Sequence, residues 1–158
     1  MKILEISGNT VYSVWHSTEF SGEMMHAIEE LASFHSDEID GDELGVIDID
    51  WARIFTSWHY VFLVHRQQQL IGYAMVMCGF DTHRRGKKIG FMSGIFIHPE
   101  HREGLIGYKL IKHIRDFALG EADLSYIEFD VRPKRDFSKL LQRLGASYRS
   151  AHYVFKRD

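Results

Sequence analysis

The chain has little cysteine and proline, and it has no long apolar run. Its 158 residues include one cysteine and two prolines. The single Cys78 cannot form a disulfide within the chain, and a structural zinc site built on several cysteines is excluded. No apolar stretch reaches membrane length and no N-terminal signal is recognisable, so we expect a cytoplasmic protein without membrane contact.

The chain also lacks an excess of charge of either sign. It carries 19 Lys and Arg against 22 Asp and Glu, a formal net charge of −3, which argues against nucleic acid as a partner. One basic cluster, residues 84–88, is most simply a solvated loop. Acidic residues gather between Glu29 and Glu43; they would favour a cationic or amine-bearing acceptor, or serve only solubility.

Repeats, low-complexity stretches and linkers are absent too, which predicts one domain over residues 1–158. Periodicity predicts helices at 23–34, 105–119 and 137–144, and strands at 1–7, 60–65, 70–80, 88–98, 126–131 and within 147–156. Three consecutive strands need hairpins, whereas later strand–helix–strand units favour parallel pairing. The predicted fold class is α/β (α+β), a mixed, mostly antiparallel sheet of about six to seven strands with helices on both faces.

The strand expected at 88–98 contains two irregular residues. Gly94 predicts a β-bulge or a close backbone approach. Strict alternation would place five residues on one face: Ile89, Phe91, Ser93, Ile95 and Ile97. Ser93 is the polar member of that set, so it either bonds to a neighbour or lines an acceptor pocket.

The segment from Ile95 to Leu110 predicts a backbone anion site. An apolar strand ends at His98-Pro99, a charged turn follows, and an amphipathic helix begins. Unpaired N–H groups at a helix N-terminus carry partial positive charge, and Gly104 and Gly107 let a phosphate approach the main chain. Arg102 adds a forked cation. The segment lies where the meander passes to crossovers, which is where a cleft is expected.

This order and these motifs resemble the GNAT family of acyl-CoA-dependent N-acyltransferases. The family pattern is a hydrophobic strand, x-Pro, Arg/Gln-x-x-Gly-x-Gly/Ala and an amphipathic helix. Ile97-His98-Pro99, Arg102 and Gly107 match it, whereas Leu105 stands at the middle glycine and Gly104 lies one residue early. LLQRLGASY at 140–148 resembles the family's second pattern. The strings HPEHREG and KLLQRLG look most like small bacteriophage acetyltransferases, which would place the protein in the host cytoplasm.

The resemblance implies acetyl-CoA as co-substrate, in a V-shaped opening between strands 88–98 and 126–131. Strand backbone would hold the pantetheine arm, and the turn would hold the pyrophosphate. The implied set is Ile95, Phe96, Ile97, Arg102, Glu103, Gly104, Leu105, Ile106, Gly107 and Tyr108. A primary amine of a small molecule or protein would attack the thioester directly, and an N–H near Phe96 would hold the oxyanion.

The residues that would move protons are less well defined. The family's general-acid tyrosine aligns with Leu141, which cannot donate a proton, and its asparagine aligns with Lys134. Tyr108 or Ser138 could replace the tyrosine. The remaining catalytic candidates are His83 in a loop that should overlook the cleft, Ser93, and Asp130 near the end of the last crossover strand. The simplest reading of His83 is an exposed loop histidine. Asp130 could be the base or form an ion pair on the surface.

The helix at 23–34 carries a candidate acceptor site. His26 and Glu30 lie four residues apart on one face, with Glu29 beside them. In the resembled family this helix borders the acceptor pocket, so these side chains could bind or deprotonate an amine; otherwise they form a solvated face. We expect no metal site, because the histidine pairs have the wrong spacing to share an ion.

Three functions remain open from the sequence. The first is an active N-acetyltransferase. The second is a catalytically weak or inactive GNAT-fold protein that binds and blocks a host factor, favoured by Leu105 and Leu141. The third is acyl transfer to a nucleobase amine, with residues 84–88 on the phosphate backbone. The final strands of such folds often pair, so a homodimer is also expected as an option.

Overall fold

The computed structural model describes residues 1–38, 47–131 and 136–148, and shows one sheet between two layers of helices. The six strands lie in chain order: β1 (Lys2–Ser7), β2 (Thr10–His16), β3 (His59–Arg66), β4 (Gln69–Phe80), β5 (Lys88–Ile97) and β6 (Tyr126–Phe129). The helices are η1 (Ser17–Glu19), α1 (Gly22–Glu38), α2 (Trp51–Thr56), η2 (Pro99–His101), α3 (Ile106–Leu119) and α4 (Ser138–Arg143).

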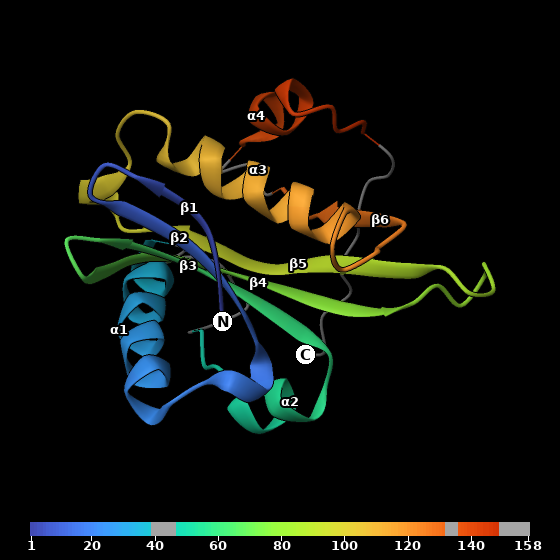
Figure 1. Cartoon of the computed structure of the whole chain (residues 1–158), viewed down its shortest axis with the longest axis horizontal. Helices are drawn as coiled ribbons and strands as arrows, with labels where there is room; N and C mark the ends of the chain where they lie inside the picture. Colours follow the sequence, from blue (N-terminus) through green and yellow to red (C-terminus); the bar gives the residue numbers. More distant parts are fainter. Residues whose placement is uncertain (39–46, 132–135, 149–158) are drawn as a thin grey trace, which may run out of the picture.

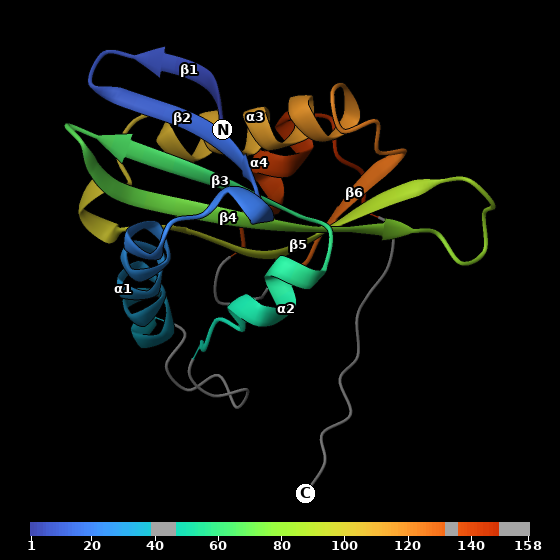
Figure 2. The same ribbon diagram turned by 60° about the horizontal axis from the view of Figure 1, so that its bottom comes forward.

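The arrangement confirms the predicted fold class. β1 to β5 pair antiparallel in sequence, and β6 pairs parallel to β5. Figures 1 and 2 show α1 and α2 on one face of the sheet and α3 and α4 on the other. Most of the strands predicted within 147–156 lies outside the described residues. Within the part of the chain that the structure describes, no helix is long and apolar enough to span a membrane.

Strand β2 was not expected from the sequence. It forms a hairpin with β1, in which Ser7 pairs with Thr10 and Gly8 has a φ of 58°. Tyr12 and Val14 of β2 are buried in the core. A Gly-Asn turn between two short apolar runs is a hairpin signal, so residues 8 and 9 carried the information that would have predicted this strand.

Helix α1 begins where expected and runs four residues further than the predicted end. The N–H of Met24 donates to the hydroxyl of Ser21 at 3.3 Å, so Ser21 caps the start of the helix. The buried residues Ile28, Leu31 and Ala32 pack against the sheet. The longer helix brings Glu38 to the far end of β5, a position that becomes important below.

Helix α3 has the buried stripe that its periodicity predicted: Leu110, Ile111, Ile114 and Ala118. The same helix is tied to the edge strand β1 by polar contacts. The ammonium of Lys109 donates to Glu5 Oε1 at 2.5 Å and to Ser7 Oγ at 2.7 Å, and His113 Nε2 lies 2.8 Å from Glu5 Oε2. The hydrogen bond from Lys109 is the main reason why the pKa of Glu5 is lowered.

Strand β5 contains the bulge that Gly94 predicted. Met75 pairs with Gly94 and Val76 pairs with Met92, so Ser93 is the additional residue. The bulge reverses the alternation of side chains along the strand. A Cβ built on Gly90 would meet Val76 and Leu124 beneath α3, whereas one on Gly94 would meet Tyr73 on the α1 face.

The predicted common face of β5 is therefore wrong. Ile95 and Ile97 pack with the core beneath α3. Ile89 and Phe91 flank Gly90 and point to the opposite face, because neighbouring side chains in a strand alternate. Strict alternation was assumed across a glycine that was itself expected to cause a bulge, and the one-residue insertion at Ser93 breaks it.

Candidate active site

In the part of the chain that the structure describes, strand β5 has two strand neighbours over its first half and one over its second half. Its pairing with β6 runs from Ile89↔Tyr126 to Met92↔Phe129, whereas its pairing with β4 continues to Ile97. Beyond Met92, no strand in the described ranges pairs with β5 on the β6 side. The loss of pairing coincides with the bulge at Ser93. Strand-like hydrogen-bonding positions on Gly94–Ile97 therefore face away from β4 without a partner strand.

An apolar cluster from four elements surrounds the place where β5 and β6 lose their pairing. Its members are Ile95 of β5, Tyr108 and Ile111 of α3, Phe129 at the end of β6, and Leu140, Leu141 and Leu144 in and after α4, together with Val131 and Phe137. Leu141 is buried and has no proton to donate. Tyr108 is the member of this cluster with an ionisable hydroxyl, and it comes from the first turn of α3.

The turn after β5 has its glycine at the residue whose backbone requires one. Gly104 has a φ of 60°, in the left-handed region that glycine occupies without strain. Leu105 has a φ of −108°, which any residue adopts, and its side chain is exposed. The leucine at the middle motif position therefore causes no backbone strain, and the early glycine fits the turn as it is built here.

The N-terminus of α3 is not capped by the side chain of its N-cap residue. Leu105 makes no side-chain cap hydrogen bond, and the first helical bond from this residue is the one between its carbonyl and the N–H of Lys109 at 2.8 Å. The N–H groups of Ile106, Gly107 and Tyr108 precede that bond, so they have no carbonyl four residues back within the helix. They point out of the helix end and carry its partial positive charge.

Arg102 lies at this turn as predicted, but its guanidinium is already engaged. Nε donates to the carbonyl of Ile97 at 2.7 Å. Nη1 lies 2.6 Å from Oε1 of Glu38, and Nη2 donates to Oε2 of the same residue at 2.7 Å. The guanidinium also lies over the ring of Phe96, 5.3 Å from its centroid. The carboxylate of Glu38 thus holds the position at Arg102 where a phosphate was expected.

The neighbouring Glu103 is also in an ion pair. Its Oε1 accepts from Nη1 of Arg66 at 2.7 Å, and this hydrogen bond is the main cause that lowers the pKa of Glu103. The side chain of Glu103 is exposed. A ligand phosphate at the turn would therefore meet the main-chain N–H of Glu103, with the carboxylate held back toward the end of β3.

The acceptor candidates on α1 lie together on an exposed surface. His26 Nδ1 is 3.9 Å from Glu29 Oε2, and His26 Nε2 is 3.5 Å from Glu30 Oε1. The indole N–H of Trp51 donates to Glu29 Oε1 at 2.6 Å. The predicted proximity of these residues is confirmed. Their exposure, between 49% and 74% of each side chain, leaves them accessible to a solute.

The other catalytic candidates are not brought together. Ser93 donates its hydroxyl to the carbonyl of Met75 at 3.1 Å, the first of the two readings proposed for it. His83 lies in the loop before β5, at the opposite end of that strand from the anion turn (Figure 1). Its N–H donates to Asp81. Asp130 follows β6 and is exposed.

Sequence reasoning missed one polar pair near β5. His35 Nδ1 lies 2.9 Å from the hydroxyl of Tyr73, and its ring stacks on Phe96 with centroids 4.9 Å apart. Tyr73 on β4 pairs with Phe96 on β5. The sequence gives no signal for this contact, because 38 residues separate His35 from Tyr73.

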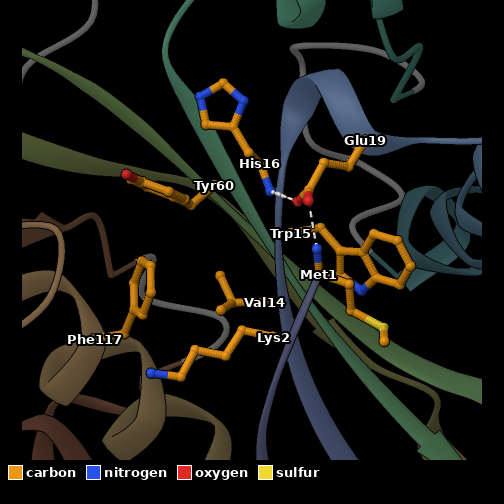
Figure 3. A pocket seen from close by; sticks show the side chains of 8 residues that line it. All are labelled: Met1, Lys2, Val14, Trp15, His16, Glu19, Tyr60 and Phe117. Carbon is orange, nitrogen blue, oxygen red and sulfur yellow. Dashed lines mark hydrogen bonds and ion pairs between the residues drawn. The ribbon is translucent and has the colours of Figure 1, made fainter.

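A small pocket of about 220 Å³ lies elsewhere in the molecule (Figure 3). It is lined by Met1, Lys2, Val14, Trp15, His16, Glu19, Tyr60 and Phe117. Glu19 accepts the N–H of His16 at 2.8 Å within it. None of the predicted site residues lines this pocket, so it is separate from the anion turn. Among the described residues, no group of three or more His, Cys, Asp or Glu is placed to hold a metal ion.

Comparisons with known proteins point to one family. The sequence profile described as "Acetyltransferase (GNAT) family" matches residues 23–146. No curated protein matches the chain in sequence.

Several solved structures share the fold. A ribosomal-protein-alanine N-acetyltransferase from Brucella melitensis biovar Abortus 2308 matches with a TM-score of 0.69 and 17% identity, over 94% of this chain and 99% of that one. An aminoglycoside acetyltransferase from an uncultured soil metagenomic sample, in complex with trehalose, gives 0.68 and 12%, over 98% and 100%. The aminoglycoside N-acetyltransferase AAC(6')-Iy, in complex with CoA, gives 0.62 and 14%, over 92% and 98%. At these identities the likeness establishes the fold alone.

Proposed function

Because the chain belongs to the acetyltransferase (GNAT) family, we propose that it transfers an acetyl group from acetyl-CoA to a primary amine by direct attack. This membership agrees with the acyltransferase activity that the sequence predicted. One observation carries the more specific proposal. The half of β5 that pairs with no described strand on the β6 side leads directly into a glycine turn and a helix end without a side-chain cap.

The donor would bind along this path. Main-chain groups of Ile95, Phe96 and Ile97 bond to the amide-bearing pantetheine arm, which takes the place of the missing strand neighbour. The N–H groups of residues 103–108 bind the pyrophosphate at the start of α3. A solved structure with this fold, AAC(6')-Iy, is described in complex with CoA, which supports CoA as the donor.

The reaction needs little from side chains. The neutral amine attacks the thioester carbonyl, an N–C bond forms, and the oxyanion is held by a main-chain N–H near Phe96. Collapse of the intermediate breaks the C–S bond and expels the CoA thiolate, while the amine proton passes to a base or water. Tyr108 is our candidate donor to the thiolate, because it packs against the same buried cluster as Ile95 and Phe129, which come from the two strands of the opening.

The acceptor would be a cationic amine of a small molecule or of a protein. The exposed group of His26, Glu29 and Glu30 supplies negative charge, and such a surface attracts an ammonium group. Solved structures with this fold include proteins named for aminoglycoside and for ribosomal-protein-alanine acetylation, which supports the amine class. The closer resemblance to bacteriophage enzymes stays a prediction.

The test begins with donor binding to the purified chain. We expect acetyl-CoA to raise the melting temperature, and a panel of aminoglycosides, polyamines and peptides to release CoA thiol with at least one acceptor. Absence of any thermal shift at about 1 mM acetyl-CoA, a concentration typical of weak substrate binding, would sink the proposal. Desalted enzyme and acetyl-CoA without acceptor serve as the background for thiol release.

A second candidate is a family member that binds a partner without catalysis. Two observations favour it: Leu141 is buried at the position where the family carries a general-acid tyrosine, and Glu38 already occupies Arg102. This candidate predicts no thiol release across the same amine panel, together with stoichiometric capture of one protein. Thiol release that requires an added amine rejects it.

A further inference from the structure

Both hydrogen-bonding edges of the Arg102 guanidinium already have partners within the chain. A guanidinium can bind an oxygen pair in two ways, through Nη1 with Nη2 or along the side that includes Nε. Glu38 takes the first edge with contacts of 2.6 and 2.7 Å, and the carbonyl of Ile97 takes Nε at 2.7 Å. A pyrophosphate that binds Arg102 through a forked pair of hydrogen bonds must therefore replace one of these two partners.

Glu38 is the partner that gives way more easily. The carbonyl of Ile97 belongs to the last residue of β5, so its displacement would disturb the strand and the turn together. Glu38 is the final residue of α1, and its side chain is 24% exposed, so water can solvate the carboxylate after release. A carboxylate that stayed at Arg102 would also repel the incoming phosphates at short range.

The last turn of α1 depends on several contacts with this region. Phe34 meets the ring of His98 edge-on at 4.9 Å. His35 stacks on Phe96, the same ring that Arg102 covers. The ion pair of Glu38 with Arg102 is the charged contact in this set, so its exchange for a phosphate weakens the hold on the end of α1 while the aromatic contacts remain.

We propose that Glu38 is an internal counter-ion that the pyrophosphate of CoA displaces from Arg102, so that donor binding releases the last turn of α1. This inference rests on the proposed function, because it takes CoA as the ligand of the turn. It adds that, before CoA binds, the carboxylate of Glu38 occupies the position at Arg102 that the pyrophosphate later takes. It also connects the donor turn to the helix that carries His26, Glu29 and Glu30.

The first experiment measures CoA affinity by calorimetry in matched variants. Glu38→Gln removes the competing charge, so we expect CoA to bind about tenfold more tightly, the factor that about 1.4 kcal/mol produces. Glu23→Gln removes an equal charge from the exposed start of the same helix, and its CoA affinity should stay within about twofold, as expected for a distant surface charge. Unchanged or weaker binding by Glu38→Gln overturns the proposal.

A double-mutant cycle identifies Arg102 as the route of the effect. In an Arg102→Gln background, Glu38→Gln should no longer change CoA affinity, because the group that both anions share has gone. A Glu38→Gln effect that persists in that background overturns the exchange at Arg102. Melting temperatures of all four proteins, recorded without CoA, show whether each variant is folded.

Amide hydrogen exchange of the wild-type chain tests the proposal in one sample, because it predicts slower exchange in one segment and faster exchange in another. On addition of CoA, residues 104–108 should exchange more slowly and residues 34–38 more rapidly. Slower or unchanged exchange at 34–38, with protection at 104–108, rejects the counter-ion while leaving the proposed function intact. Absence of CoA binding to the wild-type chain instead rejects the proposed function itself.

Discussion

The two halves of β5 share one backbone but have different surroundings. Residues 88–92 are hydrogen-bonded to β4 on one side and, from Ile89, to β6 on the other. Within the described residues, 94–97 pair with β4 alone. The first half contains Gly90, pressed between side chains of the core, whereas the second contains Gly94, which has ordinary space around it. The comparison teaches that the candidate site lies where β6 stops pairing with β5, and that one additional residue marks the boundary.

The ends of the same strand differ in a parallel way. Arg84, in the loop before β5, is exposed and pairs with Asp81 at 3.4 Å. Arg102, in the turn after β5, is linked to a strand carbonyl, a carboxylate and an aromatic ring. The basic cluster at 84–88 is also partly neutralised, because Lys88 lies 3.4 Å from Asp123. The cation after β5, Arg102, is therefore held by contacts within the fold, whereas the cation before it, Arg84, is exposed on a loop.

The largest expected effect tests this difference between the two ends. Arg102→Glu replaces a forked cation with a carboxylate at the anion turn, so we expect acetyl-CoA affinity to fall by at least about 100-fold, given about 1.5–3 kcal/mol for a charged hydrogen bond and added repulsion. Arg84→Glu makes the same charge change at the other end and should alter affinity less than about twofold. Equal losses would show that overall charge, and not the turn, controls binding. Calorimetry with folded variants decides between these results.

An effect of intermediate size on stability is expected from substituting the glycines in the two halves of β5. A Cβ at Gly90 would lie 2.9 Å from Leu124 and 3.1 Å from Val76, so Gly90→Ala overpacks the core and should cost about 1–3 kcal/mol of unfolding free energy. A Cβ at Gly94 would lie 3.8 Å from Tyr73, an ordinary contact, so Gly94→Ala should be neutral or stabilise by up to about 1 kcal/mol. Urea unfolding measures both. Similar losses at the two sites would contradict the difference in packing.

The smallest effect concerns the anchor of α3, which begins beside the half of β5 that β6 leaves unpaired. Glu5→Gln removes the partner of Lys109 and should cost less than about 1 kcal/mol at pH 7, because the contact is partly exposed. The pKa of Glu5 is lowered in the folded state. Its stabilisation is therefore complete above the unfolded value of about 4.3 and is lost as the pH falls through the lower folded value.

Urea unfolding from pH 3 to 7 checks this prediction. The difference in stability between the wild type and Glu5→Gln should shrink on acidification, whereas Glu23→Gln, exposed on α1, should show no comparable trend. A difference that grows toward acid pH would reverse the sign and exclude Glu5 as a stabilising carboxylate.

The sequence predicted those elements whose signals are local. Apolar periodicity predicted α3 and its buried face, and Gly94 predicted the bulge in β5. The turn at residue 104 was recognised from glycine, arginine and the helix start, all within a few positions. β2 was the exception, since its Gly-Asn turn was present in the sequence and was overlooked. The side-chain faces of β5 were wrong because the consequence of the bulge was not carried along the strand.

Contacts between distant segments could not be predicted in this way. Glu38 reaches Arg102 across 64 residues, and the pairing depends on how far α1 extends and where the sheet places its end. The position of His83, by contrast, follows from chain order alone, because the loop before β5 and the turn after it lie at opposite ends of that strand. The roles of Tyr108, Asp130 and the α1 group in catalysis stay predictions until a ligand defines the reacting atoms.

The additional residue in β5 acts as a phase reversal between two stretches of alternating side chains. Before Ser93 even-numbered residues face α3, and after it odd-numbered residues do. Deleting Ser93 would bring the two stretches into the same phase and force one of them to exchange its buried and outward sides. Residues added in the loop at 81–87 would leave the phase unchanged. The fold should therefore tolerate insertions in the loop before β5, whereas the insertion or deletion of a single residue in the middle of the strand should disrupt its packing.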